Sequence, residues 1–341
     1  MSTHQTVAGY KVTIGSVSFS HNSSNALLSC VVEDHVDMAT ICQVTVSTAE
    51  NQPTNSFKIG DKVSVKLRTE DEIFSGEVIA VDHAFQGKGT SSMIIKCVDN
   101  SHRLGRGRKT KFWNDMKDSD VAQEVGAESK LSVECDDTGE VHKYILQRNE
   151  SNISFLKRLA ARNNFQVRVE PGKLLFKKAS TGGTAKELST NSGLLSLNMS
   201  YNSSEMAQQV IVRGWDPATK KEIVGKASAS DVANIGGGEN GAQLSSVFGE
   251  ETAYITDVPV KTQEQADMLA KSEMERIARK FCKGKCSFIG DASVRAGTVV
   301  NIKDFGQHLN GTFYVVSSRH ILTPSSGYKT EISFCSNTLG K

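Results

Sequence analysis

Five basic residues crowd into one short stretch of this 341-residue sequence: Arg103, Arg106, Arg108, Lys109 and Lys111, with Phe112–Trp113 directly after them. Guanidinium and ammonium groups bind phosphates and aromatic rings stack on bases, so this basic cluster could bind nucleic acid. No other segment continues a basic track, and the formal net charge is only +2. We therefore favour a solvated loop or a contact with an acidic protein partner.

The other residue types that could carry chemistry do not form a recognisable site. The eight histidines (4, 21, 35, 83, 102, 142, 308 and 320) include no His-Glu-x-x-His pair, and Cys282 and Cys286 lack a second ligand pair at zinc spacing. The adjacent carboxylates at 136–137 and 250–251 lie in polar stretches, where they stay solvated. The glycine-rich 236–241 lacks the Gly-Lys-Ser/Thr ending of a phosphate loop, and no Gly-x-Ser-x-Gly elbow is present. The sequence predicts no catalytic residue, no metal, no cofactor and no enzymatic activity.

An internal repeat is the strongest organising signal. Segments 59–66 and 296–303 each start with a turn glycine and then alternate apolar residues, Val63 and Val65 in one and Val300 and Ile302 in the other. A glycine introduces a second strand in each copy (76–83 and 311–320), and a Gly/Ser-rich turn leads to a third (93–98 and 330–335). His83 and His320 occupy equivalent strand ends, for which we favour a shared structural role. Closely spaced alternating strands predict two similar antiparallel modules, each a small barrel or sandwich.

The segment between the two copies has helical spacing instead. Residues 118–126 place Val121, Ala122 and Val125 on one face, with Asp or Ser as N-cap and a glycine at the end. Residues 152–162 repeat this logic, Asn163–Asn164 can take the left-handed turn that ends a helix, and 165–169 with 173–176 predict a hairpin. Residues 181–184 have the composition of a linker.

The second copy contains further elements. Strands are predicted at 194–198 and 209–215, and 231–251 is expected to be an exposed, flexible loop because it is rich in glycine and lacks hydrophobic periodicity. Thr262 and Gln265 have the spacing of a capping box at the start of a helix over 262–282, whose apolar stripe would cover a barrel flank.

Composition limits the class of protein. Hydrophobic residues make up 38% of the chain, which argues against global disorder, and the length suggests about two domains. The N-terminus lacks the pattern of a secretory signal, and no apolar run is long enough for a membrane span. The seven cysteines form an odd, scattered set, which we interpret as reduced thiols in a protein assembled in the cytoplasm.

Three ordered segments resemble a known family. They are 151–167 with 173–178, then Val212–Lys220, then 297–330 with Gly311–Val316 and His320. This pattern is similar to the late control gene D protein of contractile-tailed phages. It also resembles the N-terminal half of the type VI secretion spike protein (VgrG) and the hubs of phage-tail-like extracellular injection systems.

The resemblance implies a baseplate hub. In such a hub, three chains form a ring whose two modules per chain present six similar faces to a hexameric inner tube, while the other side seats a trimeric spike. Because the sequence ends at Lys341 without a β-prism or a lysozyme-like segment, the resemblance implies that the spike is a separate protein. It also implies other baseplate proteins as partners, in a virion or a tail-like particle, with no nucleic acid and no membrane span.

The predicted fold class is α+β, mainly β. Its parts are a first barrel module over 1–112, an α/β insertion over 113–185, and a second barrel module over 186–341. Two alternatives stay open: a baseplate-associated hydrolase that acts on the cell wall, and a nucleic-acid-binding protein that uses the basic cluster at 103–111.

Overall fold

A computed structural model describes residues 9–20, 26–36, 38–48, 57–67, 72–85, 91–170, 172–178, 185–216, 219–306 and 308–340. The predicted linker at 181–184 and the turn residues 86–90 lie outside this part of the chain. Strands predominate among the described residues, in agreement with the mainly β prediction. No helix in the described ranges is both long and apolar enough to cross a membrane.

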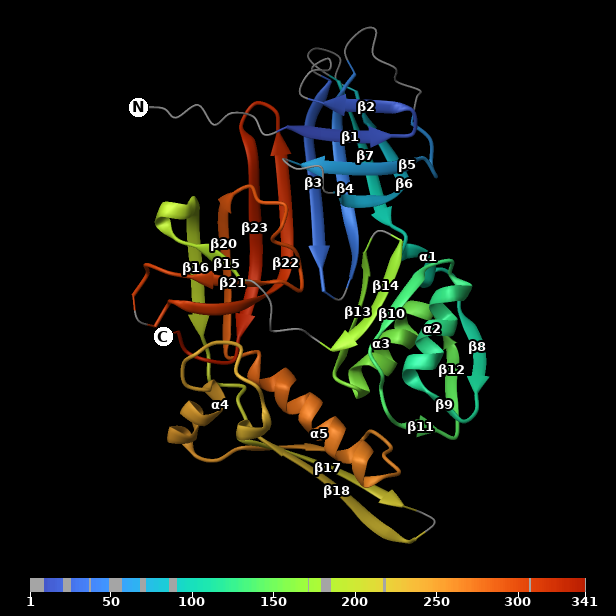
Figure 1. The fold of residues 1–341 in the computed structure, drawn as a ribbon, viewed down its shortest axis with the longest axis vertical. Helices are drawn as coiled ribbons and strands as arrows, with labels where there is room; N and C mark the ends of the chain where they lie inside the picture. The colour runs from blue at the N-terminus through green and yellow to red at the C-terminus, as the bar shows by residue number, and fades with distance from the viewer. Residues whose placement is uncertain are drawn as a thin grey trace.

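One 13-stranded, curled sheet runs through the chain (Figure 1). Its main path has the order β16-β20-β23-β22-β3-β4-β7-β6-β5-β1-β2, with β15 and β21 attached beside β22. The path is open at β16 and at β2, so two separately closed barrels are not confirmed. The strands are β1 Tyr10–Ile14, β2 Val17–Ser20, β3 Leu27–His35, β4 Met38–Ser47, β5 Lys62–Leu67, β6 Glu72–Ala84, β7 Ser92–Asp99, β15 Lys186–Leu188, β16 Leu194–Tyr201, β20 Cys282–Ile289, β21 Val299–Ile302, β22 Gly311–Thr323 and β23 Gly327–Ser336.

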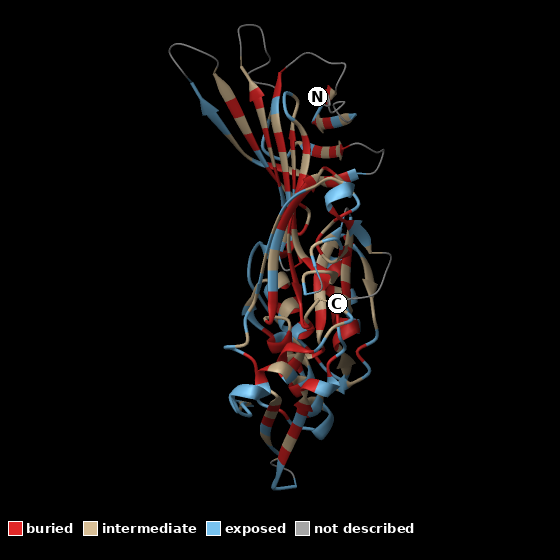
Figure 2. Cartoon of the chain, turned by 90° about the vertical axis from the view of Figure 1, so that its left-hand side faces the viewer, coloured by how far each residue is buried: buried red, intermediate tan, exposed pale blue. Residues whose placement is uncertain are grey.

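Alternating burial along these strands divides each into a core side and an outer side (Figure 2). In β5, for example, Val63, Val65 and Leu67 are buried while Lys62 is exposed, as expected where successive side chains point to opposite faces. The buried side chains form one hydrophobic cluster under β1–β7 and another under the second half of the sheet. Leu322 and Tyr328, from β22 and β23, belong to the cluster of the first half. The two halves therefore share part of their packing.

The segment after β7 folds around a third cluster of buried residues. Its helices are α1 His102–Gly105, α2 Asp118–Glu128 and α3 Asn152–Arg162, and its strands are β8 Lys109–Trp113, β9 Met116–Lys117, β10 Ser132–Cys135, β11 Val141–His142, β12 Ile145–Glu150, β13 Phe165–Glu170 and β14 Lys173–Lys178. The predicted helices and hairpin are confirmed. Asn164 takes a positive φ of 56°, as expected at the end of α3.

Two details of α2 differ from the prediction. The N-cap residue is Lys117, and its side chain makes no cap hydrogen bond. Asp118, one of the expected caps, is instead the first residue of the helix, where it is fully buried and paired with Arg162. Gly126 does not end the helix, which continues to Glu128. A Cβ at Gly126 would lie 2.3 Å from Val133, so this glycine lets the helix approach the neighbouring sheet.

The insertion between β16 and β20 forms a small three-stranded sheet covered by α5. Its elements are β17 Gln209–Asp216, β18 Lys221–Ser228, β19 Thr252–Ile255, α4 Gly241–Leu244 and α5 Gln263–Ala278, with short 3-10 turns η2 Ala229–Asp231 and η3 Ser245–Phe248; a third turn, η1 Thr190–Ser192, precedes β16. Thr262 caps α5 as predicted, accepting from the Gln265 backbone N at 3.1 Å. The Gln265 side chain accepts instead from Lys261 N at 2.9 Å.

Residues 231–251 pack against the C-terminal segment. Asn337, which is 1% exposed, accepts from Ile235 N at 2.8 Å and donates to Ala233 O at 2.9 Å. Gly238 lies so close to Leu339 that a Cβ would meet its carbonyl oxygen at 2.0 Å. The flexibility expected for this loop stays a prediction.

Candidate functional site

The two halves of the main sheet repeat one strand pattern. The first half has the order β3-β4-β7-β6-β5, and the second half has the order β16-β20-β23-β22-β21, so the strands correspond in sequence order and in space. The predicted repeat covered three of these five strands in each half. The remaining two pairs, β3 with β16 and β4 with β20, were missed.

Hydrogen bonds reproduce this correspondence in detail. Gly60 N donates to Val78 O at 2.8 Å and Val78 N donates to Asp61 O at 2.9 Å. At the same positions of the second half, Gly297 N donates to Val315 O at 2.8 Å and Val315 N donates to Thr298 O at 2.9 Å. A β-bulge follows Val78 in β6 and Val315 in β22.

The shared register corrects one detail of the predicted alignment. Val63 and Val300 correspond as expected, but Gly76 corresponds to Phe313, and Phe74 corresponds to Gly311. The aromatic ring and the glycine have exchanged places. In the first half the Phe74 ring fills the space beside Gly76, where a Cβ would come within 2.7 Å of it. The two halves therefore each place one phenylalanine and one glycine at these two positions, but in the opposite order.

The two halves meet at a seam, which we define as the pairing of β22 Ser317–Leu322 with β3 Cys30–His35. On the outer face of the seam, Arg319 Nε donates to Glu33 Oε1 at 2.8 Å. On the core face, Arg295 Nε donates to the buried Asp34 Oδ2 at 3.0 Å. Backbone pairing is thus reinforced by one ion pair on each face.

His320 lies on the core face of the seam and is fully buried. Its Nδ1 lies 2.8 Å from the Tyr328 hydroxyl and 3.3 Å from the Thr330 hydroxyl, and its Nε2 has no partner among the described residues. Burial, with a smaller contribution from Arg295, lowers the pKa of His320 to about 3. The imidazole is therefore neutral at physiological pH. His83, its counterpart in β6, is exposed, so a shared role is not evident within one chain.

Within the two five-strand units, two strand edges are left without a neighbour in the described part of the sheet. One is the outer edge of β6 beyond Val78, which corresponds to the edge of β22 that binds β3. The other is the outer edge of β16, which corresponds to the edge of β3 that binds β22. The pairing of β22 with β3 thus has no equivalent pairing of β6 with β16 among the described residues. Unpaired edges of this kind are templates for pairing with another chain.

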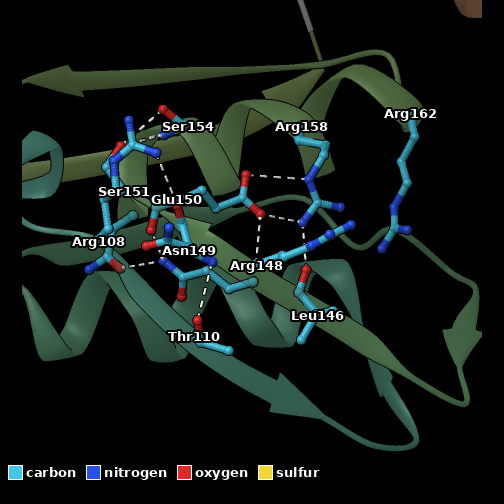
Figure 3. A network of polar contacts seen from close by, with 12 residues as sticks. Arg108, Thr110, Leu146, Arg148, Asn149, Glu150, Ser151, Ser154, Arg158 and Arg162 are labelled. Atoms are coloured by element: carbon cyan, nitrogen blue, oxygen red, sulfur yellow. Dashed lines mark hydrogen bonds and ion pairs between the residues drawn. The ribbon is translucent and has the colours of Figure 1, made fainter.

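The basic cluster of the sequence is largely neutralised by carboxylates. Arg103 pairs with Glu77, Lys109 with Glu128 at 3.0 Å, and Lys111 with Glu124 and Glu128 at 2.7 Å each. Arg108 donates to Asn149 O at 3.2 Å (Figure 3). Arg106 is exposed and has no carboxylate partner among the residues that the structure describes.

The two neighbouring aromatic residues both stack on other rings of the chain. Trp113 is buried, stacks on Phe155 with ring centroids 5.2 Å apart, and donates to Glu124 at 2.7 Å. Phe112 is 58% exposed and stacks on Tyr144. The structure does bring the five basic residues to one region, where Arg103, Lys109 and Lys111 are paired with carboxylates. Arg106 and Arg108 have no carboxylate partner in the described part of the chain.

Two groups of polar contacts connect elements of the α/β insertion, one at the exposed Arg158 and one at the buried Asp118. Arg158 Nη2 donates to Leu146 O and to Glu150 Oε1, both at 2.6 Å, which ties α3 to β12 (Figure 3). Asp118 accepts from Arg162 Nε at 2.5 Å and from Asn163 at 2.6 Å. Burial favours a higher pKa for Asp118, but hydrogen bonds from His142 and Arg162 outweigh it and hold the pKa below its usual value. Every one of these groups has a structural partner.

Groups that could hold a metal are not found among the described residues. The seven cysteines are free thiols, and burial raises the pKa of Cys282 and of Cys286 to about 12. A thiol with such a high pKa carries almost no thiolate at neutral pH and is a poor nucleophile or ligand.

The sequence did contain a signal for the missed strands. Leu27-Leu28-Ser29 in β3 and Leu194-Leu195-Ser196 in β16 are identical, occupy the same register, and carry a bulge at the same place. Three residues are too few to identify a repeat across more than 160 intervening positions. The equivalent pairing of β3 with β4 and of β16 with β20 identifies the two segments as corresponding strands.

Comparison with known proteins places this fold among tail proteins. A protein-family model described as the Alg8 N-terminal domain matches residues 12–324. No curated protein sequence matches the chain.

Several solved structures share the fold. The 43 kDa tail protein of prophage MuSo2 from Shewanella oneidensis has a TM-score of 0.75 at 14% identity, covering 96% of this chain and 97% of that one. The tail protein from Neisseria meningitidis MC58 has a TM-score of 0.73 at 11% identity, covering 96% of each chain. An E. coli component of the type VI secretion system, described as similar to the T4 bacteriophage tail proteins gp27 and gp5, has a TM-score of 0.65 at 9% identity, covering 95% of this chain and 76% of that one. At these identities the likeness concerns the fold.

Proposed function

We propose that this chain, which belongs to the Alg8 N-terminal domain family, is a structural hub protein, because it has the fold of phage tail proteins. It would act in the baseplate of a contractile phage tail or a related injection system. Its role is assembly and not catalysis. The likeness to a type VI secretion component supports the same class of machine.

The repeated strand pattern is the observation that carries this proposal. Three copies of a chain with two similar modules present six similar faces, so a threefold ring can match a hexameric inner tube. The insertions after β7 and after β16 differ from each other. They restrict the symmetry to threefold and provide distinct surfaces for a separate trimeric spike and for other baseplate proteins.

The proposal also accounts for the open sheet. A ring in which every module continues into the next would cover the outer edges of β6 and β16, which have no neighbour in the described part of a single copy. The barrel-like closure expected for each module would then arise between chains.

Mass measurement of the purified chain tests the proposal. Analytical ultracentrifugation over a range of concentrations should give a species of three chains, and pull-down with the inner tube protein and the spike protein of the same particle should recover both. A chain that stays monomeric at every concentration and recovers neither partner contradicts the hub role. Lysis of peptidoglycan by the purified chain would contradict the non-catalytic assignment.

A further inference from the structure

We propose that the outer edge of β6 in one copy pairs antiparallel with the outer edge of β16 in a second copy, with Phe85 as the apolar anchor of the contact. The inference rests on the proposed function only in requiring that copies of the chain associate. It adds which edges meet, in which register, and which side chain secures them.

The seam inside the chain is the template for this contact. Within one chain, β22 and β3 pair through Ser317↔His35, Arg319↔Glu33 and Leu322↔Cys30. The shared register assigns Ala80, Asp82 and Phe85 to the β22 positions, and the β16 pairing assigns the β3 positions to β16. The resulting pairs between copies are Ala80↔Asn202, Val81↔Tyr201, Asp82↔Ser200, His83↔Met199, Ala84↔Asn198 and Phe85↔Leu197.

Side chains of β16 are less buried than the corresponding side chains of β3, as expected if β16 pairs with a strand of another copy. Leu27, Cys30 and Val32 of β3 are at most 4% exposed. Their counterparts Leu194, Leu197 and Met199 are only partly buried, although they pack on the second-half core. Cys30 and Val32 lie where β22 pairs with β3, whereas no described strand pairs with the outer edge of β16 at Leu197 and Met199. The difference in burial at these two positions follows that difference in pairing.

Phe85 is the side chain that a neighbouring copy would bury. It is 87% exposed, whereas its counterpart Leu322 is fully buried in the core of the first half. By the same arrangement Phe85 enters the second-half core of the next copy, opposite Leu197. A groove of about 520 Å³ lies along β16 there, lined by residues 194–199 with Thr190, Phe305 and Leu309. Aromatic anchors in such grooves dominate many interfaces.

The proposed pairs are compatible in charge. Asp82 faces Ser200, while Ala80 and Ala84 face asparagines, so no like charges lie opposite each other. In the internal seam the position of Asp82 is held by Arg319 and that of Ser200 by Glu33. Asp82 is paired within its own chain with Lys96 at 2.6 Å. The internal ion pair is therefore replaced by a neutral contact that does not oppose association.

The contact joins two different surfaces, so it is heterologous. Each copy has one β6 edge and one β16 edge, and repeating the contact produces a ring if the rotation closes. The backbone hydrogen bond from Val36 N to Val316 O at 3.1 Å, at the end of the internal seam, predicts a matching bond from Ser203 N to Ile79 O of the neighbour.

Paired cysteines test the register. The double variant Asp82→Cys/Ser200→Cys places two thiols at directly opposed, exposed positions, and the thiol oxidant diamide should link copies into covalent multimers on a non-reducing gel. The control Asp82→Cys/Ser196→Cys displaces one thiol by four residues, about 13 Å along the strand, and should not link. Circular dichroism checks that both variants fold.

Measuring the mass of the assembled species distinguishes failure of the β6–β16 contact from failure of the hub role. If the chain associates but the Asp82/Ser200 pair stays reduced, or if the displaced pair links equally well, the proposed contact is wrong and the hub role stands. If no association is detected at any concentration, both are wrong. Linking in register alone supports both.

Phe85→Asp provides a second measurement that does not use cysteines. It should abolish association while the monomer keeps its circular dichroism spectrum and its unfolding midpoint, because the side chain is exposed in the single copy. The control Phe248→Asp alters a residue of η3 that is 82% exposed and belongs to neither edge, and it should leave association unchanged. Unchanged association of Phe85→Asp overturns the anchor assignment.

Discussion

His83 and His320 occupy the same position in two copies of one strand pairing, His83 opposite Met93 and His320 opposite Thr330, yet His320 is fully buried and His83 is exposed. The difference arises at the seam. β3 covers the edge of β22 beside His320, and nothing in the described chain covers the edge of β6 beside His83. The burial of the histidine therefore differs between the two modules according to whether the adjacent strand edge is paired within the chain.

The buried His320 predicts a loss of stability on acidification. Its pKa is lowered to about 3 in the folded chain, against about 6.5 in the unfolded chain. Between these pH values the unfolded chain binds a proton that the native chain does not. The contribution to the free energy of unfolding is complete above about pH 6.5 and decreases by up to about 1.4 kcal/mol per unit as the pH falls toward 3.

Urea unfolding at several pH values between 7 and 5 measures this dependence. The His320→Gln variant keeps a polar group of similar size but cannot titrate, so its slope with pH should be shallower than that of the wild type by about one proton. Equal slopes in the two proteins would show that folding does not lower the pKa of His320.

Gly76→Ala is expected to destabilise the first half of the sheet. A Cβ there would lie 2.3 Å from the Val98 carbonyl oxygen and 2.7 Å from the Phe74 ring, and the backbone oxygen cannot move away without disturbing the pairing of β6 and β7. Overpacking of this kind costs about 1–3 kcal/mol. Thermal or urea unfolding measures the loss.

Gly105→Ala is the matched control for that substitution. The nearest atom to a Cβ at Gly105 is 3.9 Å away, which is ordinary contact, and its φ is not positive. Its free energy of unfolding should stay within about 0.5 kcal/mol of the wild type. An effect as large as that of Gly76→Ala would refute the steric explanation.

Asp118→Ala should destabilise the α/β insertion by about 2–4 kcal/mol. The carboxylate is fully buried and accepts from Arg162 and Asn163, so its removal leaves those donors without their partner. Asp137→Ala is the comparison, because Asp137 is 66% exposed and its ion pair with Lys117 is on the surface. It should cost less than about 1 kcal/mol in the same unfolding experiment. Similar losses in both variants would contradict the assigned role of burial.

The basic cluster is expected to support local structure and not DNA binding. Lys111→Ala removes contacts to Glu124 and Glu128, which hold the pKa of Lys111 above its usual value, so it should lower stability by about 1 kcal/mol. Arg106 has no ion pair among the described residues, so Arg106→Ala should change the free energy of unfolding little. Neither variant should alter the mobility of DNA in a gel at low salt. A salt-dependent DNA shift in the wild type that Arg106→Ala abolishes would restore the nucleic-acid hypothesis.

Much of the local structure could be predicted from the sequence. Periodicity located α3, α5 and the β13–β14 hairpin, because an amphipathic pattern and a capping residue act within a few positions of each other. The repeat of β5–β7 in β21–β23 was also visible, since alternating apolar residues and turn glycines specify a half-buried strand wherever they occur.

Contacts between distant residues could not be predicted in this way. Nothing near Asp118 indicates that it gives up its capping role to bind Arg162, and nothing near Lys111 indicates that Glu124 and Glu128 neutralise it. The exchange of glycine and phenylalanine between Gly76/Phe74 and Phe313/Gly311 misled the alignment for the same reason. Core volume is conserved in space and not position by position along the chain.

The sequence by itself determined that two copies of one strand unit exist, because the alternation of side chains along a strand is a local property of the backbone. Only the tertiary structure decided that β22 of the second copy pairs with β3 of the first, and that β6 and β16 keep open edges. Pairing between strands joins backbone groups whose hydrogen bonds are nearly the same for every sequence. Which edges meet is therefore settled by how the whole sheet curls and packs, and not by the residues along any one strand.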